Sequence, residues 1–135
     1  MDPATLKIRL MVGQPPQPQE FSYGQLYELL AQQMAAANYG FVAPVAVQVA
    51  NLLATDFQAQ SVAADVLLRS SQPEVALPYA QKAYEIVANP VYSLILLARC
   101  QLGLNDVDKA LLHLDQALSL EPNNASLHQE KGDVY

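Results

Sequence analysis

The chain of 135 residues carries 13 Asp and Glu against 7 Lys and Arg, a formal charge of −6. Binding to a phosphate backbone requires a basic face, so this balance disfavours nucleic acid as a partner. Hydrophobic residues make up 52% of the chain but aromatic residues only 7%, with most of the apolar content in Ala, Leu and Val. This composition favours closely packed helices over a β-sandwich, within a single domain.

The sequence favours a cytoplasmic location. Cys100 is the single cysteine, so no intrachain disulfide forms. Prolines interrupt the N-terminal region soon after Lys7 and Arg9, so we expect no signal peptide. The longest apolar stretch, 41–54, is too short for a membrane span and contains Gln48 and Asn51. We therefore expect no membrane span.

Residues 1–21 differ from the remainder and are predicted to form an N-terminal arm with a Pro-rich linker. A two-residue period of apolar side chains predicts one strand here; it is carried by Leu6, Ile8, Leu10 and Val12. Since the rest of the chain is helical, this strand has no evident partner. It either docks as an extended arm, pairs with its copy in a homodimer, or belongs to a disordered tail. Residues 14–19 contain three prolines and predict an extended linker.

From Ser22 onward, helical periodicity and turn residues predict seven helices. Ser22 is the expected N-cap of the first, and residues 38–40 are interpreted as its stop signal. Asn105 or Asp106 is expected to cap the sixth. The predicted helices span about 23–37, 42–54, 57–69, 73–87, 91–102, 107–120 and 125–135.

Small residues coincide when the chain is aligned with itself at an offset of 34 residues. Ala76 falls on Ala110 and Ala83 falls on Ala117. Small side chains where two helices cross allow their backbones to approach closely. A 34-residue unit of two such helices is the period of a helical repeat array.

On these residues the sequence resembles the tetratricopeptide repeat (TPR) family. Unit 91–124 carries the family pattern at Leu94, Leu97, Ala98, Ala110, Leu114, Ala117 and Pro122, and departs from it at Gln101, where the family has Tyr. Units 24–56 and 57–90 fit more loosely, the former through Tyr27, Leu30, Ala31, Ala43, Val47 and Ala50. The resemblance implies an all-α fold of antiparallel helical hairpins stacked as a short right-handed solenoid over 22–135.

The last unit, 125–135, is half a repeat. It is interpreted either as a polar capping helix or as a sign that the chain is cut from a longer array. Gly132 and Tyr135 match the family pattern and have little use in a cap, which favours the second interpretation.

No residue pattern indicates catalysis, a metal or another cofactor. His113 is expected to face solvent, and His128 stands at a packing position of the repeat. Cys100 is interpreted as a small buried thiol, while Asp106 and Asp108 are interpreted as a helix cap and a first-turn charge. We therefore expect the chain not to be an enzyme.

The resemblance implies that the first helix of each unit lines a concave groove that binds a peptide. At the groove positions stand Gln58, Ser61, Asp65, Leu68, Tyr92, Ile95, Arg99 and Leu102, followed by Ser126, Gln129 and Asp133. Tyr92 and Arg99 are the expected centre of binding, because an aromatic ring and a guanidinium commonly anchor interfaces. Such a mixture also occurs on solenoid surfaces that bind nothing. Family members that grip a C-terminal carboxylate carry Lys and Asn at two of these positions, and this chain has Glu28 and Gln32, or Ser61 and Asp65.

The leading hypothesis is a protein-interaction scaffold that holds a peptide or protein segment of unknown identity in this groove. One alternative is a dedicated TPR chaperone for a secretion substrate. Another is the TPR regulatory or targeting segment of a larger protein with an enzymatic part.

Overall fold

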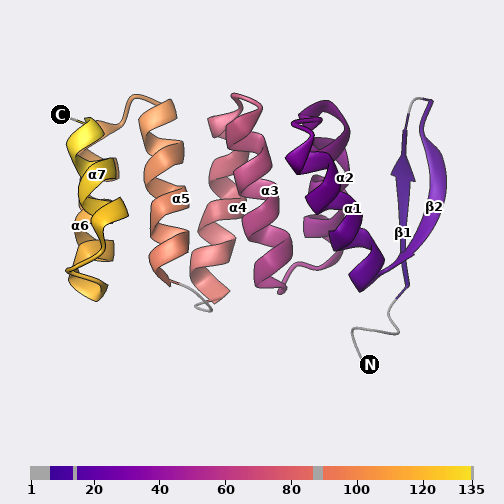
Figure 1. Ribbon diagram of the computed structural model, residues 1–135, viewed down its shortest axis with the longest axis horizontal. Coiled ribbons are helices and arrows are strands. Elements are labelled where there is room, and N and C mark those ends of the chain that lie inside the picture. The colour runs from indigo at the N-terminus through magenta and orange to yellow at the C-terminus, as the bar shows by residue number, and fades with distance from the viewer. Residues whose placement is uncertain (1–6, 14, 87–89, 135) are drawn as a thin grey trace.

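The computed structural model describes residues 7–13, 15–86 and 90–134 of the chain. These residues form a β-hairpin and seven helices that stand side by side in a row, with the hairpin at one end and the last two helices at the other (Figure 1). The elements are β1 (Lys7–Val12), β2 (Gln17–Ser22), α1 (Tyr23–Ala35), α2 (Tyr39–Leu52), α3 (Phe57–Arg69), α4 (Pro73–Ile86), α5 (Pro90–Gly103), α6 (Val107–Leu120) and α7 (Ala125–Val134). The predicted fold class, a short stack of helical hairpins, is confirmed.

The 34-residue period appears directly in the backbone. Ala37, Ser71 and Asn105 each have a positive φ of about 60°, and they are spaced by 34 residues. Each lies in the turn that joins the two helices of a unit, where a left-handed residue reverses the chain. The repeat therefore begins at α1, and its first unit has the same length as the next two.

Small residues at the helix crossings set how closely each pair of helices packs. In the pairs α3–α4 and α5–α6 these positions are fully buried alanines: Ala64, Ala76, Ala83, Ala98, Ala110 and Ala117. In the first pair the corresponding buried residues are Leu30, Val42 and Val49. With these larger side chains at the crossing, α1 and α2 pack less extensively on each other than the helices of the other two pairs.

The predicted register of the first unit was therefore wrong by one residue. Ala31, one of the residues that suggested it, is exposed, and Ala43 is only half-buried. The alanine pattern misled because the buried positions of this unit hold branched residues instead.

The helix ends follow the predicted caps, and the start of the second helix needs a correction. The Ser22 side chain accepts a hydrogen bond from the Gln25 amide and forms a capping box with that residue. Of the two predicted caps of α6, Asn105 and Asp106, the structure has Asp106. The second helix begins at Tyr39, so Tyr39 and Gly40 form its first turn and are not a stop signal. The predicted ends at Val87 and Tyr135 lie outside the described residues.

The N-terminal strand has a partner, contrary to the expectation of a lone strand. β1 pairs antiparallel with β2, with Leu10 opposite Gln19 and Met11 opposite Pro18. The prediction missed β2 because its polar, proline-containing sequence resembles a linker, although an edge strand tolerates proline. Leu6 and Gln14 lie outside the described residues.

The hairpin packs on α2 and extends the core. Ile8, Leu10 and Val12 are buried on its inner side. The Gln48 side chain bonds both backbone groups of Met11, accepting from its N–H and donating to its C=O, at 2.9 Å each. Pairing of two copies through this arm stays a prediction. No helix in the described ranges is long and apolar enough to cross a membrane.

Candidate functional site

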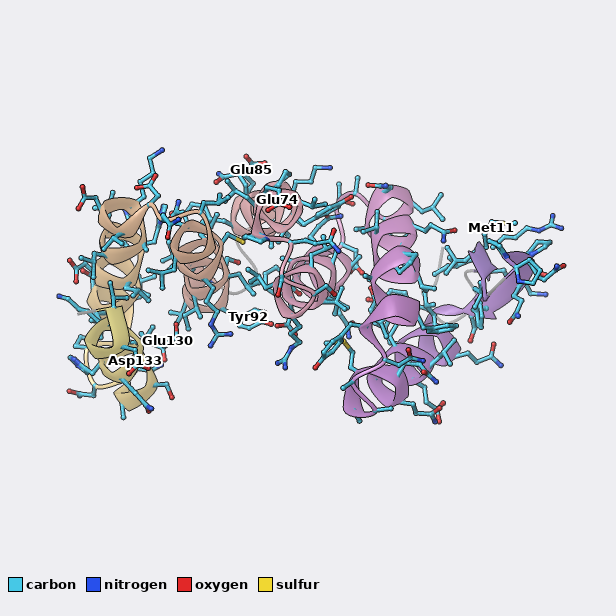
Figure 2. The ribbon with its side chains drawn as sticks, turned by 90° about the horizontal axis from the view of Figure 1, so that it is seen from above. Met11, Glu74, Glu85, Tyr92, Glu130 and Asp133 are labelled. Atoms are coloured by element: carbon cyan, nitrogen blue, oxygen red, sulfur yellow. The ribbon has the colours of Figure 1, made fainter. Side chains whose placement is uncertain are left out.

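The first helices of the units share one side of the molecule. Viewed from above, Tyr92 of α5 and Glu130 and Asp133 of α7 lie on one side, whereas Glu74 and Glu85 of α4 lie on the other (Figure 2). We call the surface formed by α3, α5 and α7 on the side of Tyr92 the A-helix face. The residues predicted for the groove all belong to these three helices.

The four predicted residues of α3 differ in what they offer a ligand. Gln58 is exposed, and its Oε1 lies 3.0 Å from the Tyr23 hydroxyl. Ser61 is only 5% exposed, and its hydroxyl donates to the Gln58 carbonyl at 3.2 Å, so it serves the helix and presents almost no surface. Asp65 and Leu68 are half-buried one and two turns further along.

The predicted residues of α5 form an aliphatic and aromatic strip with one cation. Tyr92, Ile95 and Leu102 are half-buried and pack against the core. Burial, and then the negative charge of Asp65, raise the pKa of the Tyr92 hydroxyl, so it remains protonated and able to donate. Arg99 is exposed.

A pocket of about 600 Å³ brings three of the predicted residues together between α3 and α5. Asp65, Leu68 and Arg99 line it, and so do four residues that the sequence did not indicate: Arg69, Ser71, Pro73 and Gly103. Arg69 could have been predicted from the sequence, because it stands four residues after Asp65 on the same helix, the spacing at which opposite charges pair. The contact between α4 and the end of α5 had no signal in the sequence.

Gly103 permits this close contact. A Cβ built at this position would lie 2.7 Å from the Pro73 Cβ and 2.8 Å from its Cγ. No real Cβ tolerates such a separation, so only glycine lets the end of α5 approach the start of α4 at the rim of the pocket.

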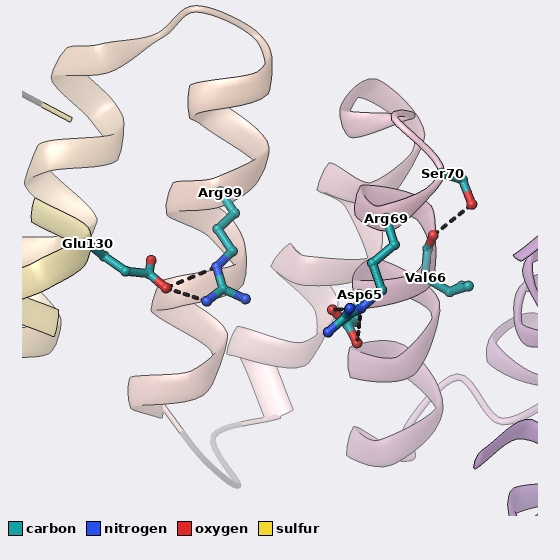
Figure 3. Close-up of polar contacts among 6 residues, drawn as sticks. All are labelled: Asp65, Val66, Arg69, Ser70, Arg99 and Glu130. Carbon is teal, nitrogen blue, oxygen red and sulfur yellow. Dashed lines mark hydrogen bonds and ion pairs between the residues drawn. The ribbon is translucent and has the colours of Figure 1, made fainter. Parts of the chain in front are cut away.

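Both arginines of the pocket are paired with carboxylates of the same chain (Figure 3). The Arg69 Nε lies 3.2 Å and 3.3 Å from the two Asp65 oxygens, one helical turn away. The Arg99 Nε and Nη2 both donate to Oε1 of Glu130 on α7, with the Nε bond at 3.1 Å. Glu130 was not among the predicted residues, since the pair spans 31 positions in sequence.

α7 docks on both helices of the preceding unit. Leu127 is fully buried, Glu130 pairs with Arg99 of α5, and the Lys131 Nζ lies 2.6 Å from the Asp115 carboxylate of α6. Leu127, and not His128, is therefore the bulky packing residue of this helix. His128 is exposed, and its Nε2 lies 2.8 Å from the Pro122 carbonyl oxygen.

The other predicted residues of α7 face solvent. Ser126, Gln129 and Asp133 are all exposed. Asp65, Arg99 and Asp133 occupy the same position of three successive units, so charges of alternating sign follow one another along the A-helix face.

A tyrosine pair closes the face at its α1 end, and sequence reasoning missed it. The hydroxyls of Tyr23 and Tyr27 donate to the same Asp56 oxygen, at 2.9 Å and 3.2 Å, and the ring centroids are 4.6 Å apart. Asp56 also caps α3 by accepting from the Ala59 amide. Burial is the largest cause of the raised pKa of both hydroxyls. The cluster ties α1 to α3 through donors that stay protonated.

The remaining candidate groups serve packing. His113 was expected to face solvent, but its Nδ1 lies 2.7 Å from the Oε1 of Gln101, a residue only 7% exposed. Cys100 is buried as predicted, and burial raises the pKa of its thiol to about 12. Among the described residues, no cluster of His, Cys, Asp and Glu is arranged to hold a metal ion.

Comparison with solved structures shows the same fold in proteins of low sequence similarity. The structure titled "MamA RS-1 ArsTM double mutant" superposes with a TM-score of 0.74 at 22% identity, covering 82% of this chain and 62% of that one. The chain therefore spans less than two thirds of the MamA chain. The Yersinia enterocolitica type III secretion translocator chaperone SycD superposes with a TM-score of 0.69 at 18% identity, covering 82% of this chain and 84% of that one.

Curated protein sequences contain no match to this chain. A family model does match it: residues 67–132, from the end of α3 into α7, fit the model described as Tetratricopeptide repeat. This region contains the unit 91–124 in which the sequence pattern is clearest. Residues 67–132 therefore match the tetratricopeptide repeat family, and the 34-residue spacing of the turns continues the same pattern back to α1.

Proposed function

We propose that the chain is a protein-interaction module that binds a segment of another polypeptide along the A-helix face. The family and the fold support a protein-interaction role in general. The observation that carries the specific proposal is the pocket between α3 and α5, because Asp65, Leu68 and Arg99 from two units line one cavity.

The chemistry of this face suits a peptide segment. Half-buried apolar side chains such as Ile95 and Leu102 lie on the same helix as Arg99, which is 44% exposed. Apolar surface with a few hydrogen-bonding and charged groups can bind a segment by burying its side chains while fixing its orientation. Among the described residues, no metal cluster offers a competing chemistry.

A second candidate is a chaperone that holds a secretion substrate. The chaperone SycD has the same fold and a similar extent, with 84% of its chain covered. At 18% identity this similarity shows the fold alone, so the candidate rests on size and architecture. Both candidates require the A-helix face to hold a polypeptide, and they differ in whether the ligand is insoluble without it.

Affinity capture from the source lysate tests the proposal. The bait variant combines Tyr92→Ala and Arg99→Gln, and a matched control combines Glu74→Gln and Glu85→Gln on the opposite side (Figure 2). Circular dichroism first confirms that both variants keep the helix content of the parent chain. We expect a partner retained by the parent and the control to be lost by the A-helix-face variant. Equal retention by all three proteins would show that the partner binds elsewhere.

A further inference from the structure

We infer that two copies of this chain associate through the exposed side of α2, with α2 of one copy packed against α2 of the other. We call this surface the α2 face. It consists of the exposed residues of α2 and the two hollows that flank them. The α2 face is separate from the A-helix face, so the inference goes beyond the proposed function and does not depend on it.

α2 carries no charge, although one side of it is exposed. Residues 29–55 contain no Asp, Glu, Lys, Arg or His, whereas α4 and α6 each carry three Asp, Glu or Lys residues. Gly40 and Pro44 are exposed, and the Leu52 side chain is 60% exposed. A helix that is apolar on all sides is normally buried on all sides. We therefore expect a further element to cover the exposed side of α2.

Two hollows flank the start of α2 and meet over it. One of about 680 Å³ lies between α2 and the tip of the hairpin, and one of about 520 Å³ lies between α2 and the turn from α3 to α4. The hairpin tip and this turn lie along the same edge of the stack (Figure 1). Gly40 and Pro44 line both hollows. Among the described residues, no charged side chain lines either one; the apolar lining includes Met11, Pro15, Phe41, Ala43, Val47 and Leu67.

The absence of charge favours a second copy of the same acidic chain as the occupant. At a formal charge of −6, two copies repel each other wherever their acidic residues meet. No acidic residue lies on the described part of either hollow. Two copies can therefore bury apolar surface here without bringing like charges together.

The polar side chains of the α2 face are already bonded within the chain. The Gln48 amide bonds both backbone groups of Met11. The Asn51 Oδ1 accepts from the Tyr79 hydroxyl, and the Ser70 hydroxyl donates to a carbonyl of α3. An extended peptide would bring backbone groups that need partners, whereas a helix satisfies its own. α2 of a second copy therefore suits this surface better than an extended segment.

The α2 face also has projections beside its hollows. Met11, Leu52 and Val75 are 47%, 60% and 40% exposed. Across a two-fold axis a surface contacts its own copy, so each projection needs a hollow on the same surface. Gly40 has no side chain, and a Cβ there would meet nothing within 4 Å. The surface of α2 is therefore low between the two hollows, which lets a second helix approach closely.

Light scattering on the parent chain over a range of concentrations tests the inference without a known partner. We expect the mass to rise to twice that of one chain. Pro44→Glu places a charge on the α2 face and should weaken association about tenfold or more. Pro78→Glu is the matched control, because Pro78 is exposed at the equivalent position of α4, 34 residues later, and the variant adds the same charge. Circular dichroism confirms that both variants fold.

Chemical crosslinking tests where the copies meet. Cys100 is fully buried, so the thiol introduced by Pro44→Cys or Pro78→Cys is the reactive one in each variant. A short bis-maleimide should join two copies of the Pro44→Cys variant and leave the Pro78→Cys variant as single chains. Equal crosslinking of the two variants would overturn the α2 face as the contact.

The remaining outcomes also decide the inference. A parent chain that stays monomeric at every concentration would overturn it and leave the α2 face to a different polypeptide. Equal weakening by Pro78→Glu would attribute the effect to net charge and overturn it as well. The variant Tyr92→Ala, Arg99→Gln should dimerise like the parent, because the A-helix face takes no part in this contact. Failure of the dimer and failure of the proposed function are therefore distinguishable.

Discussion

The imidazole Nδ1 of His113 lies 2.7 Å from the side-chain oxygen of Gln101 and joins α6 to α5 inside one repeat. The acceptor role of the Gln101 oxygen requires a proton on this nitrogen. Gln101 stands where the family pattern has tyrosine, so this pair supplies a polar link between the two helices where a larger ring is usual.

This environment predicts a pH dependence of stability. Burial is the largest cause that lowers the pKa of His113 below its usual 6.5. As pH falls, the unfolded chain therefore binds the proton first, and the stability from neutral His113 is lost from pH 6.5 downward. Between about pH 7.5 and about pH 5.5, the melting temperature should fall more in the parent than in His113→Gln. If calorimetry shows the same fall of the melting temperature in the parent and in His113→Gln, His113 does not have this role.

Gly103→Ala should destabilise the stack by about 1–3 kcal/mol, because its Cβ would overlap the rigid Pro73 ring. Gly132→Ala is the matched control, since a Cβ there meets nothing within 4 Å. Alanine has a higher helix propensity than glycine, so the control substitution should leave stability unchanged or raise it slightly. Urea unfolding of the two variants measures the difference, and equal midpoints would contradict the close approach of α5 to α4.

Gln60→Leu should lower the free energy of unfolding by about 1–2 kcal/mol. Gln60 is fully buried, and its Nε2 donates to the carbonyls of Ala50 and Leu53 at 2.7 Å and 3.2 Å, closing the end of α2. Leucine fills the same space but leaves both carbonyls without this donor. Gln81→Leu, on the exposed side of α4, is the control and should change stability much less. A smaller effect at Gln60 than at Gln81 would contradict this capping role.

Cys100 should resist thiol reagents while the chain is folded. Its side chain is fully buried and burial raises its pKa to about 12, so almost no thiolate is present near neutral pH. Labelling with a disulfide reagent should therefore proceed at the rate of opening and should become fast in denaturant. Rapid labelling of the native chain would show that α5 is exposed in solution.

The sequence predicted the helices well where local chemistry marks their ends. Pro73 and Asp106 stand at starts of helices, so α4 and α6 began where predicted. The alanines at the helix crossings of the second and third units were also recognised from the sequence, because close packing of two helices requires small side chains there. In the first unit, Val42 and Val49 take these positions and the register was lost.

The interactions missed are those between residues distant in sequence. β2 became recognisable only through its pairing with β1, since its own residues are polar. The phase of α6 placed His113 outward, but it gave no indication that Gln101 lies beside it. Likewise Arg99 was predicted as a ligand-binding cation, while its present partner, Glu130, comes from another helix. Contacts between residues this far apart in the sequence leave no local pattern from which they could be predicted.

Site-specific photocrosslinking is the most direct test of binding along the A-helix face. A photoreactive amino acid replaces Asp133 in one variant and Glu85 in another, two exposed positions on opposite sides of the stack (Figure 2). After irradiation in the source lysate, we expect a discrete polypeptide adduct from position 133 and none from position 85. An adduct from position 85 alone, or equal adducts from both, would contradict the account.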